Sequence, residues 1–335
     1  MRPLALTFAA WTLCCAAAAL PAQSPLAAKS FLPADYRNVV FADLAAMRDK
    51  GVWDELQASL LKTAFQQMEK EAGFELRALD RVTSIANPGS GTSWRDTPDA
   101  TRVFVLEGNS KLGFPESVLQ NWTEEQVGKF TVRALGDREL YVNPRPELLV
   151  FGSASVVRPV LEGKPNAGLP SADVMSLLSG RGDSLAYFVF DTALPLLRNE
   201  VLGRLFPDTK WDDGQAPVFV CVRVVATGDA DDPHLGVEAV LRHAAAGGMD
   251  VSSKAADALL ERLQAMPEMR AVKPLLQRVE KKRDRSDLVY ALDLGRVREA
   301  VGHVASLAGP LFRTRSTETV EKLDAPREAA PQPKK

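Results

Sequence analysis

The feature that most constrains the fold of this chain is a series of short apolar runs joined in pairs by turn residues. Gly136-Asp137-Arg138 and Asn143-Pro144-Arg145-Pro146 separate three such runs, at Lys129–Leu135, Glu139–Val142 and Glu147–Gly152. Turn residues of this kind favour hairpins, and strands joined by hairpins are antiparallel. Helical segments alternate with these strands. The pattern therefore predicts an α+β fold with largely antiparallel sheets and helices packed on one face.

Periodicity places the individual elements. Apolar residues recur every four positions from Val52 to Met68, which predicts a helix over 52–73 that ends at Gly73. Another helix is expected over 253–266, with Ser252 or Ser253 as its cap. The remaining predicted strands are 38–43, 81–86, 101–107, 184–191, 217–226, 234–243, 275–282 and 287–294, and the remaining predicted helices are 115–125, 154–162, 171–179, 193–205 and 296–308.

The order of elements repeats. NVVFADLAAMRDKGVWDEL and SLAYFVFDTALPLLRNEVL each run a strand that ends in Asp into a helix, and similar elements follow in both halves. We therefore predict two similar α+β modules, over 31–180 and 181–312, from an internal duplication. Residues 313–335 are rich in Arg, Lys, Glu, Ala and Pro without an apolar stripe, which predicts a disordered tail.

The N-terminus has the layout of a secretory signal. Arg2 precedes a run without charge from Leu4 to Leu20, and Pro21 and small residues follow. The run lies at the lower edge of the ~20 residues that span a membrane. We predict a signal peptide over 1–23, cleaved after Ala22 or slightly later, and hence export to the periplasm, cell envelope or medium. Two alternatives stay open: an uncleaved leader, which would be the only membrane contact, and lipid attachment at Cys14 or Cys15.

Charge and cysteine content exclude several classes of protein. The formal net charge of −2 removes the excess of cations that nucleic-acid binding needs. Only Cys221 lies outside the leader, so no disulfide can form within the exported chain. Cys221 sits in the apolar run VFVCVRVV, which predicts a buried, inert thiol.

Recognisable catalytic motifs are absent from the sequence, and we assign no catalytic, cofactor-binding or metal-ligating residue. The nucleotide-binding glycine patterns, H-E-x-x-H, C-x-x-C and G-x-S-x-G do not occur. Histidine is limited to His234, His243 and His303. His234 and His243 fall at opposite ends of one predicted strand, about 30 Å apart at ~3.3 Å per residue, too far to share a metal. His303 is interpreted as a structural or surface residue.

Several short motifs have a structural interpretation beside a functional one. Gly228–His234 carries three aspartates and predicts a hairpin turn, with a calcium site as the alternative. Arg181-Gly182-Asp183 is interpreted as a connector, not an adhesion signal, and Asn121-Trp122-Thr123 matches a glycosylation acceptor but falls in a predicted helix. Gly89–Ser93 lacks the neighbours of a phosphate loop. Arg278–Asp287 is expected to be a solvated hairpin tip.

The chain also resembles a known group of proteins. Leu32-Pro33-Ala34-Asp35 leads into Val39–Leu44, and Leu148–Ala154 is followed by a helix and a second strand that ends in Asp191. In this pattern the chain resembles exported bacterial proteins grouped as a domain of unknown function. The resemblance covers most of residues 31–310, implies duplicated α+β modules behind a signal peptide, and supplies no catalytic residue.

These observations favour an exported, non-catalytic binding or scaffolding protein of the cell envelope, whose partner is an envelope protein or ligand that the sequence does not identify. The alternative is an exported hydrolase whose Ser, His and Asp meet only in the fold. That alternative requires a carboxylate and a hydroxyl within hydrogen-bond reach of one histidine, inside a pocket.

Overall fold

The structure, a computed structural model, describes residues 31–59, 62–87, 101–163, 170–178, 184–212, 214–227, 232–270 and 272–303. The predicted leader and the predicted tail therefore lie outside the described residues, as do Gly89–Ser93, Arg181–Asp183 and most of the turn before His234.

The first half of the chain alternates strands and helices. Its elements are β1 (Val39–Asp43), α3 (Leu44–Asp49), α4 (Val52–Ala58), α5 (Lys62–Ala72), β2 (Leu79–Asn87), β3 (Thr101–Gly108), α6 (Glu116–Leu119), β4 (Thr123–Val127), β5 (Phe130–Leu135), β6 (Glu139–Arg145), β7 (Leu148–Ser153), α7 (Ala154–Leu161) and α8 (Ala172–Leu178).

The second half follows with β8 (Ser184–Asp191), α9 (Pro195–Leu197), a π-helical turn (Arg198–Leu202), α10 (Gly203–Leu205), β9 (Phe219–Thr227), β10 (His234–Arg242), α11 (Gly248–Ala265), α12 (Lys273–Leu276), β11 (Glu280–Asp284) and β12 (Asp287–Arg296). Residues 297–303 are helical, within the helix predicted over 296–308.

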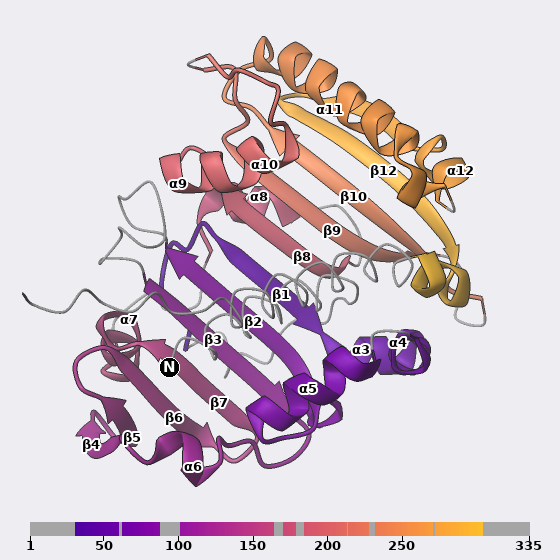
Figure 1. The fold of residues 1–335 in the computed structure, drawn as a ribbon. Coiled ribbons are helices and arrows are strands. Elements are labelled where there is room, and N and C mark those ends of the chain that lie inside the picture. The colour runs from indigo at the N-terminus through magenta and orange to yellow at the C-terminus, as the bar shows by residue number, and fades with distance from the viewer. Residues whose placement is uncertain are drawn as a thin grey trace, which may run out of the picture.

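All these strands belong to one sheet. Its order is β11-β12-β10-β9-β8-β1-β2-β3-β7-β6-β5-β4, and every neighbouring pair is antiparallel. The predicted α+β class with antiparallel strands is confirmed. Figure 1 shows the strands of the first half on one side of the β1–β8 pair and those of the second half on the other.

The two halves follow similar paths through this sheet. From the β1–β8 pair outward, the second half has the order β8-β9-β10-β12-β11, which corresponds to β1-β2-β3-β7-β6 in the first half. The strands β5 and β4 extend the first half further. β1 pairs directly with β8, and one buried apolar cluster includes Ala42 and Leu44 together with Leu185 and Val224. The halves therefore share a sheet and a core, while their origin by duplication stays a prediction.

Alternating residues along the strands define two faces. On β3, Phe104 and Leu106 join the cluster formed with α3, α4, α5 and α12, and we call this side the first face. Val103 and Val105 point the other way, into the cluster formed with α7 and α8 on the second face. The helical layer expected on one face is the first-face layer, which also includes α11. The helices α7 and α8 add a smaller layer on the second face.

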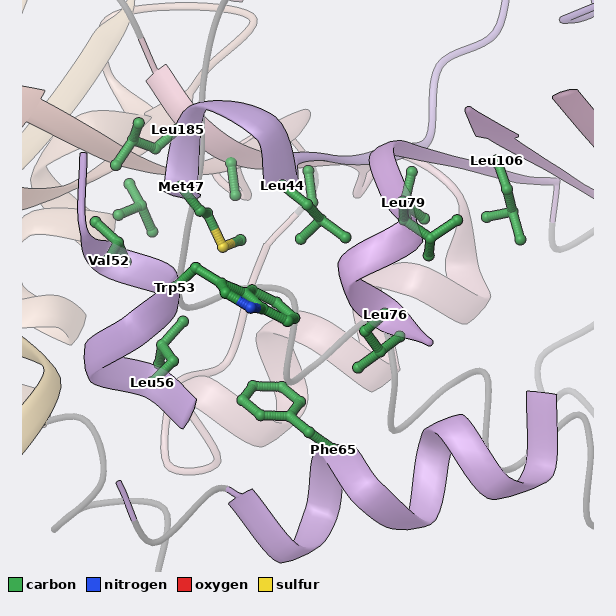
Figure 2. Packing of buried hydrophobic residues seen from close by; sticks show 14 of the residues in the cluster. Leu44, Met47, Val52, Trp53, Leu56, Phe65, Leu76, Leu79, Leu106 and Leu185 are labelled. Carbon is green, nitrogen blue, oxygen red and sulfur yellow. The ribbon is translucent and has the colours of Figure 1, made fainter. Parts of the chain in front are cut away.

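The core beneath α3 to α5 shows why the helix predicted over 52–73 is interrupted. Figure 2 shows Trp53 of α4 facing Phe65 of α5, with Met47 and Leu76 close by. The rings of Trp53 and Phe65 stack at 5.6 Å between centroids. The Ser59 hydroxyl donates to the Leu56 carbonyl at 2.6 Å, where α4 ends. The predicted continuous helix is therefore wrong, and the break separates two helices whose aromatic side chains meet.

Two further predictions are corrected by hairpins. The helix predicted over 115–125 ends at Leu119, and Thr123–Val127 form β4, which pairs with β5 through a turn at Gly128 (φ +58°). The strand predicted over 275–282 is instead Glu280–Asp284, because Leu275 belongs to α12. In both cases pairing with the next strand along the chain determines the local structure, and the pattern within one segment does not show that pairing.

Candidate functional site

The histidines were the residues on which a hydrolase would depend. His234 and His243 lie at the two ends of β10, as expected. His234 is partly exposed, and its Nδ1 lies 3.8 Å from Asp293 Oδ2. His303, the last described residue, is partly buried after the helical turns 297–303. His243 alone among the three is buried, with 2% of its surface exposed.

His243 forms a hydrogen bond with Ser252, a contact that the sequence reasoning missed. The His243 Nε2 and Ser252 Oγ atoms are 2.7 Å apart. Ser252 lies inside α11, because this helix begins at Gly248 and not near Ser253 as predicted. A Cβ atom on Gly248 would come within 2.9 Å of His243 Cδ2, so glycine allows the helix to approach the imidazole this closely. The predicted capping role of Ser252 or Ser253 is therefore wrong, since both are buried within the helix.

The surroundings of this imidazole disfavour its protonated form. Burial lowers the pKa of His243, and the polar backbone of Ser286 and Leu241 and then the Asp287 carboxylate oppose that effect. Asp287 accepts hydrogen bonds from Nε and Nη2 of Arg242, at 2.7 and 2.9 Å. Ser252, His243 and Asp287 thus lie close together, but the Asp287 carboxylate is hydrogen-bonded to Arg242. Within the described residues, His243 Nδ1 has no hydrogen-bond partner.

The pair is closed to substrate in this structure. Ser252 has 0% of its surface exposed, so an acyl group could not reach its Oγ. A shallow hollow in the described part of the chain lies elsewhere, and it is lined by Asp137, Ala154, Ser155, Arg158 and Pro159. The observed geometry therefore fixes α11 against the end of β10, and only an opening of this region would expose a hydroxyl that is already bonded to a base.

Replacement of His243 by glutamine is expected to weaken the acid sensitivity of the fold. Because the folded chain holds the His243 pKa below the usual 6.5, the unfolded chain binds more protons as the pH falls below that value. The wild type should then lose up to about 1.4 kcal/mol of unfolding free energy per pH unit from this group, and His243→Gln should not. Urea unfolding between about pH 7 and pH 5 measures the slopes.

The matched control is His234→Gln, which removes a partly exposed imidazole from the other end of β10. Because this variant keeps the buried His243, its slope should stay steeper than that of His243→Gln. Parallel slopes for wild type and His243→Gln would contradict the role assigned to burial.

A second polar cluster lies on the second face, around Arg223 of β9. This side chain is fully buried, its Nη1 donates to Ser184 Oγ at 3.1 Å, and its Nη2 donates to Glu238 Oε2. Glu238 lies directly opposite Arg223 on β10. Tyr187 is the opposite neighbour on β8, and burial raises its pKa. A charged residue in the run VFVCVRVV was the available sequence signal, but only strand pairing identifies its partner.

A third cluster crosses three strands in one row. Arg81 of β2 lies between Asp43 of β1 and Glu107 of β3. Its Nε is 2.9 Å from Asp43 Oδ2, and its Nη1 is 3.8 Å from Glu107 Oε2. Asp43 also accepts a hydrogen bond from the backbone of Ala46 at 3.0 Å, which caps α3. Burial raises the pKa of Glu107, and the Arg81 charge opposes this.

Asp191, which ends β8, has a comparable role. Its carboxylate accepts a hydrogen bond from the Ala193 backbone at 3.1 Å and pairs with Arg37 Nε at 2.9 Å. Burial raises the pKa of Asp191, and Arg37 opposes this. Asp43 and Asp191, which end their strands as predicted, therefore each accept a hydrogen bond from the backbone that follows the strand.

Cys221 is fully buried, as expected. Asn121 lies in an exposed turn between α6 and β4, so its predicted position in a helix is wrong. Asp232, the described aspartate of the turn before β10, is 3.1 Å from Arg296 Nε. The described residues contain no group of three or more His, Cys, Asp or Glu arranged to hold a metal.

Each helix in the described part of the chain is too short or too polar to span a lipid bilayer. Arg278–Asp287 was expected to be a hairpin tip, and it contributes a whole edge strand, β11, with every residue exposed.

The fold defines an α+β protein with one open antiparallel sheet. No family model matches the chain, and no curated protein does. Among solved structures, crystal form III of TP0453 is similar with a TM-score of 0.43 and 9% identity, over 85% of this chain and 100% of that one. Crystal form I of TP0453 gives a TM-score of 0.40 and 9% identity, over 85% and 99%. A likeness at this level assigns neither a function nor a site to this chain.

Proposed function

We propose that this chain is an exported, non-catalytic binding or scaffolding protein that engages its partners through the edges of its sheet. The observation that carries this proposal is the open form of the sheet. β4 and β11 each have a single neighbouring strand among the described residues, so each has one side with unpaired backbone groups.

The edges are accessible. All five residues of β11 are exposed, as are Thr123, Glu124 and Gln126 of β4. An extended segment of a partner can add to such an edge, because backbone hydrogen bonds supply affinity and alternate side chains supply specificity. The proposed export agrees with a chain whose one cysteine beyond the leader is buried.

Site-specific photo-cross-linking tests the proposal. A photoreactive amino acid at Gln126 or Lys282, in chain purified as cells produce it and mixed with envelope extract, should give discrete cross-linked products. The same group at Asp54, exposed on α4 away from both edges, is the control and should give none. Equal labelling from all three positions, or none from the edges, would overturn the proposal. The mass of the chain purified from cells tests the predicted cleavage after Ala22.

The second candidate function, an exported hydrolase, has one specific observation in its favour, the 2.7 Å contact between His243 and Ser252. A fluorophosphonate probe distinguishes the two functions. We expect no labelling of the folded chain, because Ser252 is sealed within the core. Labelling that Ser252→Ala abolishes would establish the hydrolase and replace the scaffold proposal.

A further inference from the structure

The number and direction of the strands make the two edges of the described sheet complementary. Since its twelve strands alternate in direction, β4 and β11 run in opposite directions. A second copy placed beside the first in the same orientation therefore brings its β11 antiparallel to β4, with its first face continuing the first face. We propose that copies of this chain associate end to end by pairing β4 of one with β11 of the next, an inference that rests on the proposed edge-binding function.

The backbone groups available at each edge agree with this pairing. Val127 and Phe130 close a two-residue hairpin, so Thr123, Glu125 and Val127 form their hydrogen bonds with β5. Glu124 and Gln126 then direct their N–H and C=O groups outward.

The backbone groups of β11 alternate in the same way between its hairpin partner and the outer edge. Asp284 and Asp287 close this hairpin across Arg285 (φ +55°) and Ser286. By the same alternation, Lys281 and Arg283 have the outward-facing backbone groups. A hydrogen-bonded junction must therefore place Glu124 and Gln126 opposite Lys281 and Arg283.

Only one such register overlaps all five residues of both strands. It places Glu124 opposite Arg283 and Gln126 opposite Lys281, and each opposed pair can exchange two backbone hydrogen bonds. The same register places Glu125 opposite Lys282. Opposite charges thus meet on both faces of the junction, where directly opposed side chains interact most strongly.

The existing ion pairs of each copy would extend across the junction. On the first face, Arg133 lies 3.8 Å from Glu124, and Arg283 lies 2.5 Å from Asp250 of α11. Joining Glu124 to Arg283 of the next copy gives a row of alternating charge. On the second face, Arg158 lies 2.7 Å from Glu125, which would face Lys282 of the next copy.

Pairing of like edges is disfavoured by the same charges. Two β4 strands in their fully overlapping antiparallel register place Glu125 opposite Glu125. Two β11 strands place Lys282 opposite Lys282 and Lys281 opposite Arg283. Like charges directly opposed destabilise a sheet. The junction is therefore heterologous, and it leaves a free β4 at one end and a free β11 at the other, so that association can continue along a row.

Charge-swapped variants test this arrangement. At low salt, sedimentation velocity of the wild type should show assemblies that grow with concentration and dissociate at high salt. Glu124→Lys with Glu125→Lys makes both edges basic, and Lys282→Glu with Arg283→Glu makes both acidic. Each double variant alone should remain monomeric, and an equimolar mixture should recover assembly, because each then offers the edge that the other needs.

The control is Asp49→Lys with Asp54→Lys, which changes the net charge as Glu124→Lys with Glu125→Lys does, but on exposed sites of α3 and α4, and it should assemble like the wild type. Recovery on mixing also shows that both variants are folded. A wild type that stays monomeric at low salt, variants that assemble alone, or a mixture that does not assemble would each overturn the proposal. If edge cross-links to other envelope proteins persist in that case, the proposed function stands without self-association.

Discussion

Substitution of Gly152 by alanine is expected to lower the free energy of unfolding by about 3 kcal/mol or more, the upper part of the range for overpacked sites. Gly152 lies in β7, between β3 and β6. A Cβ atom there would lie 2.2 Å from the Arg102 carbonyl oxygen and 2.8 Å from the Val103 Cα atom. Both contacts are with the backbone of the neighbouring strand, so no side-chain rotation relieves them, and β3 and β7 must move apart.

Urea unfolding measures this effect, and Gly203→Ala is the matched control. A Cβ atom on Gly203 meets nothing within 4 Å, and the residue has helical dihedral angles (φ −65°, ψ −29°). Alanine at that position should leave stability unchanged or raise it by up to about 1 kcal/mol, because it reduces the entropy of the unfolded chain. Similar small effects at both positions would contradict the close approach of β3 to β7.

Replacement of Glu238 by glutamine is expected to destabilise the fold by about 3 kcal/mol. The Arg223 guanidinium is fully buried, and the variant removes the carboxylate that faces it from β10. Loss of one partner of a buried ion pair typically costs 3–5 kcal/mol, and the lower end applies since the Glu238 side chain is 26% exposed. The loss should appear as a lower urea midpoint with an unchanged m-value.

The double variant Arg223→Met with Glu238→Leu distinguishes the net contribution of the ion pair to stability from the cost of leaving one buried charge without its partner. Apolar residues of similar size can replace a buried ion pair at little cost. We expect the double variant to be more stable than Glu238→Gln alone. If Glu238→Gln unfolds with the midpoint of the wild type, the pair contributes nothing at this site.

Most strands were predictable because their signals are local. β8 has the predicted bounds, and β10 ends one residue before its predicted end. Alternating apolar residues bounded by turn residues suffice for such strands, since side chains point to opposite faces with a period of two. The α+β class follows from the same signals.

Predictions failed where pairing or packing with another element overrode the pattern within one segment. Thr123–Val127 reads as the end of a helix, yet its backbone pairs with β5 across the turn at Gly128. The helix predicted to begin near Ser253 begins at Gly248, because the missing side chain there allows α11 to pack on His243.

The polar clusters show the same dependence on partners. Ser252 follows His243 by nine residues, a spacing without a motif, and helix packing alone brings their side chains to 2.7 Å. Arg223 and Glu238 are likewise joined only by the register of β9 and β10. The sequence contains these residues without indicating their contacts, because strand register and helix packing are long-range properties.

By itself, the sequence determined most of the described strands and the antiparallel α+β class, since each depends on residues close together in the chain. Only the tertiary structure decided that both halves join through β1 and β8 into one sheet, and that β4 and β11 form its edges. Those features depend on which strands pair, and the free energy of pairing comes from side chains and backbone groups far apart in sequence.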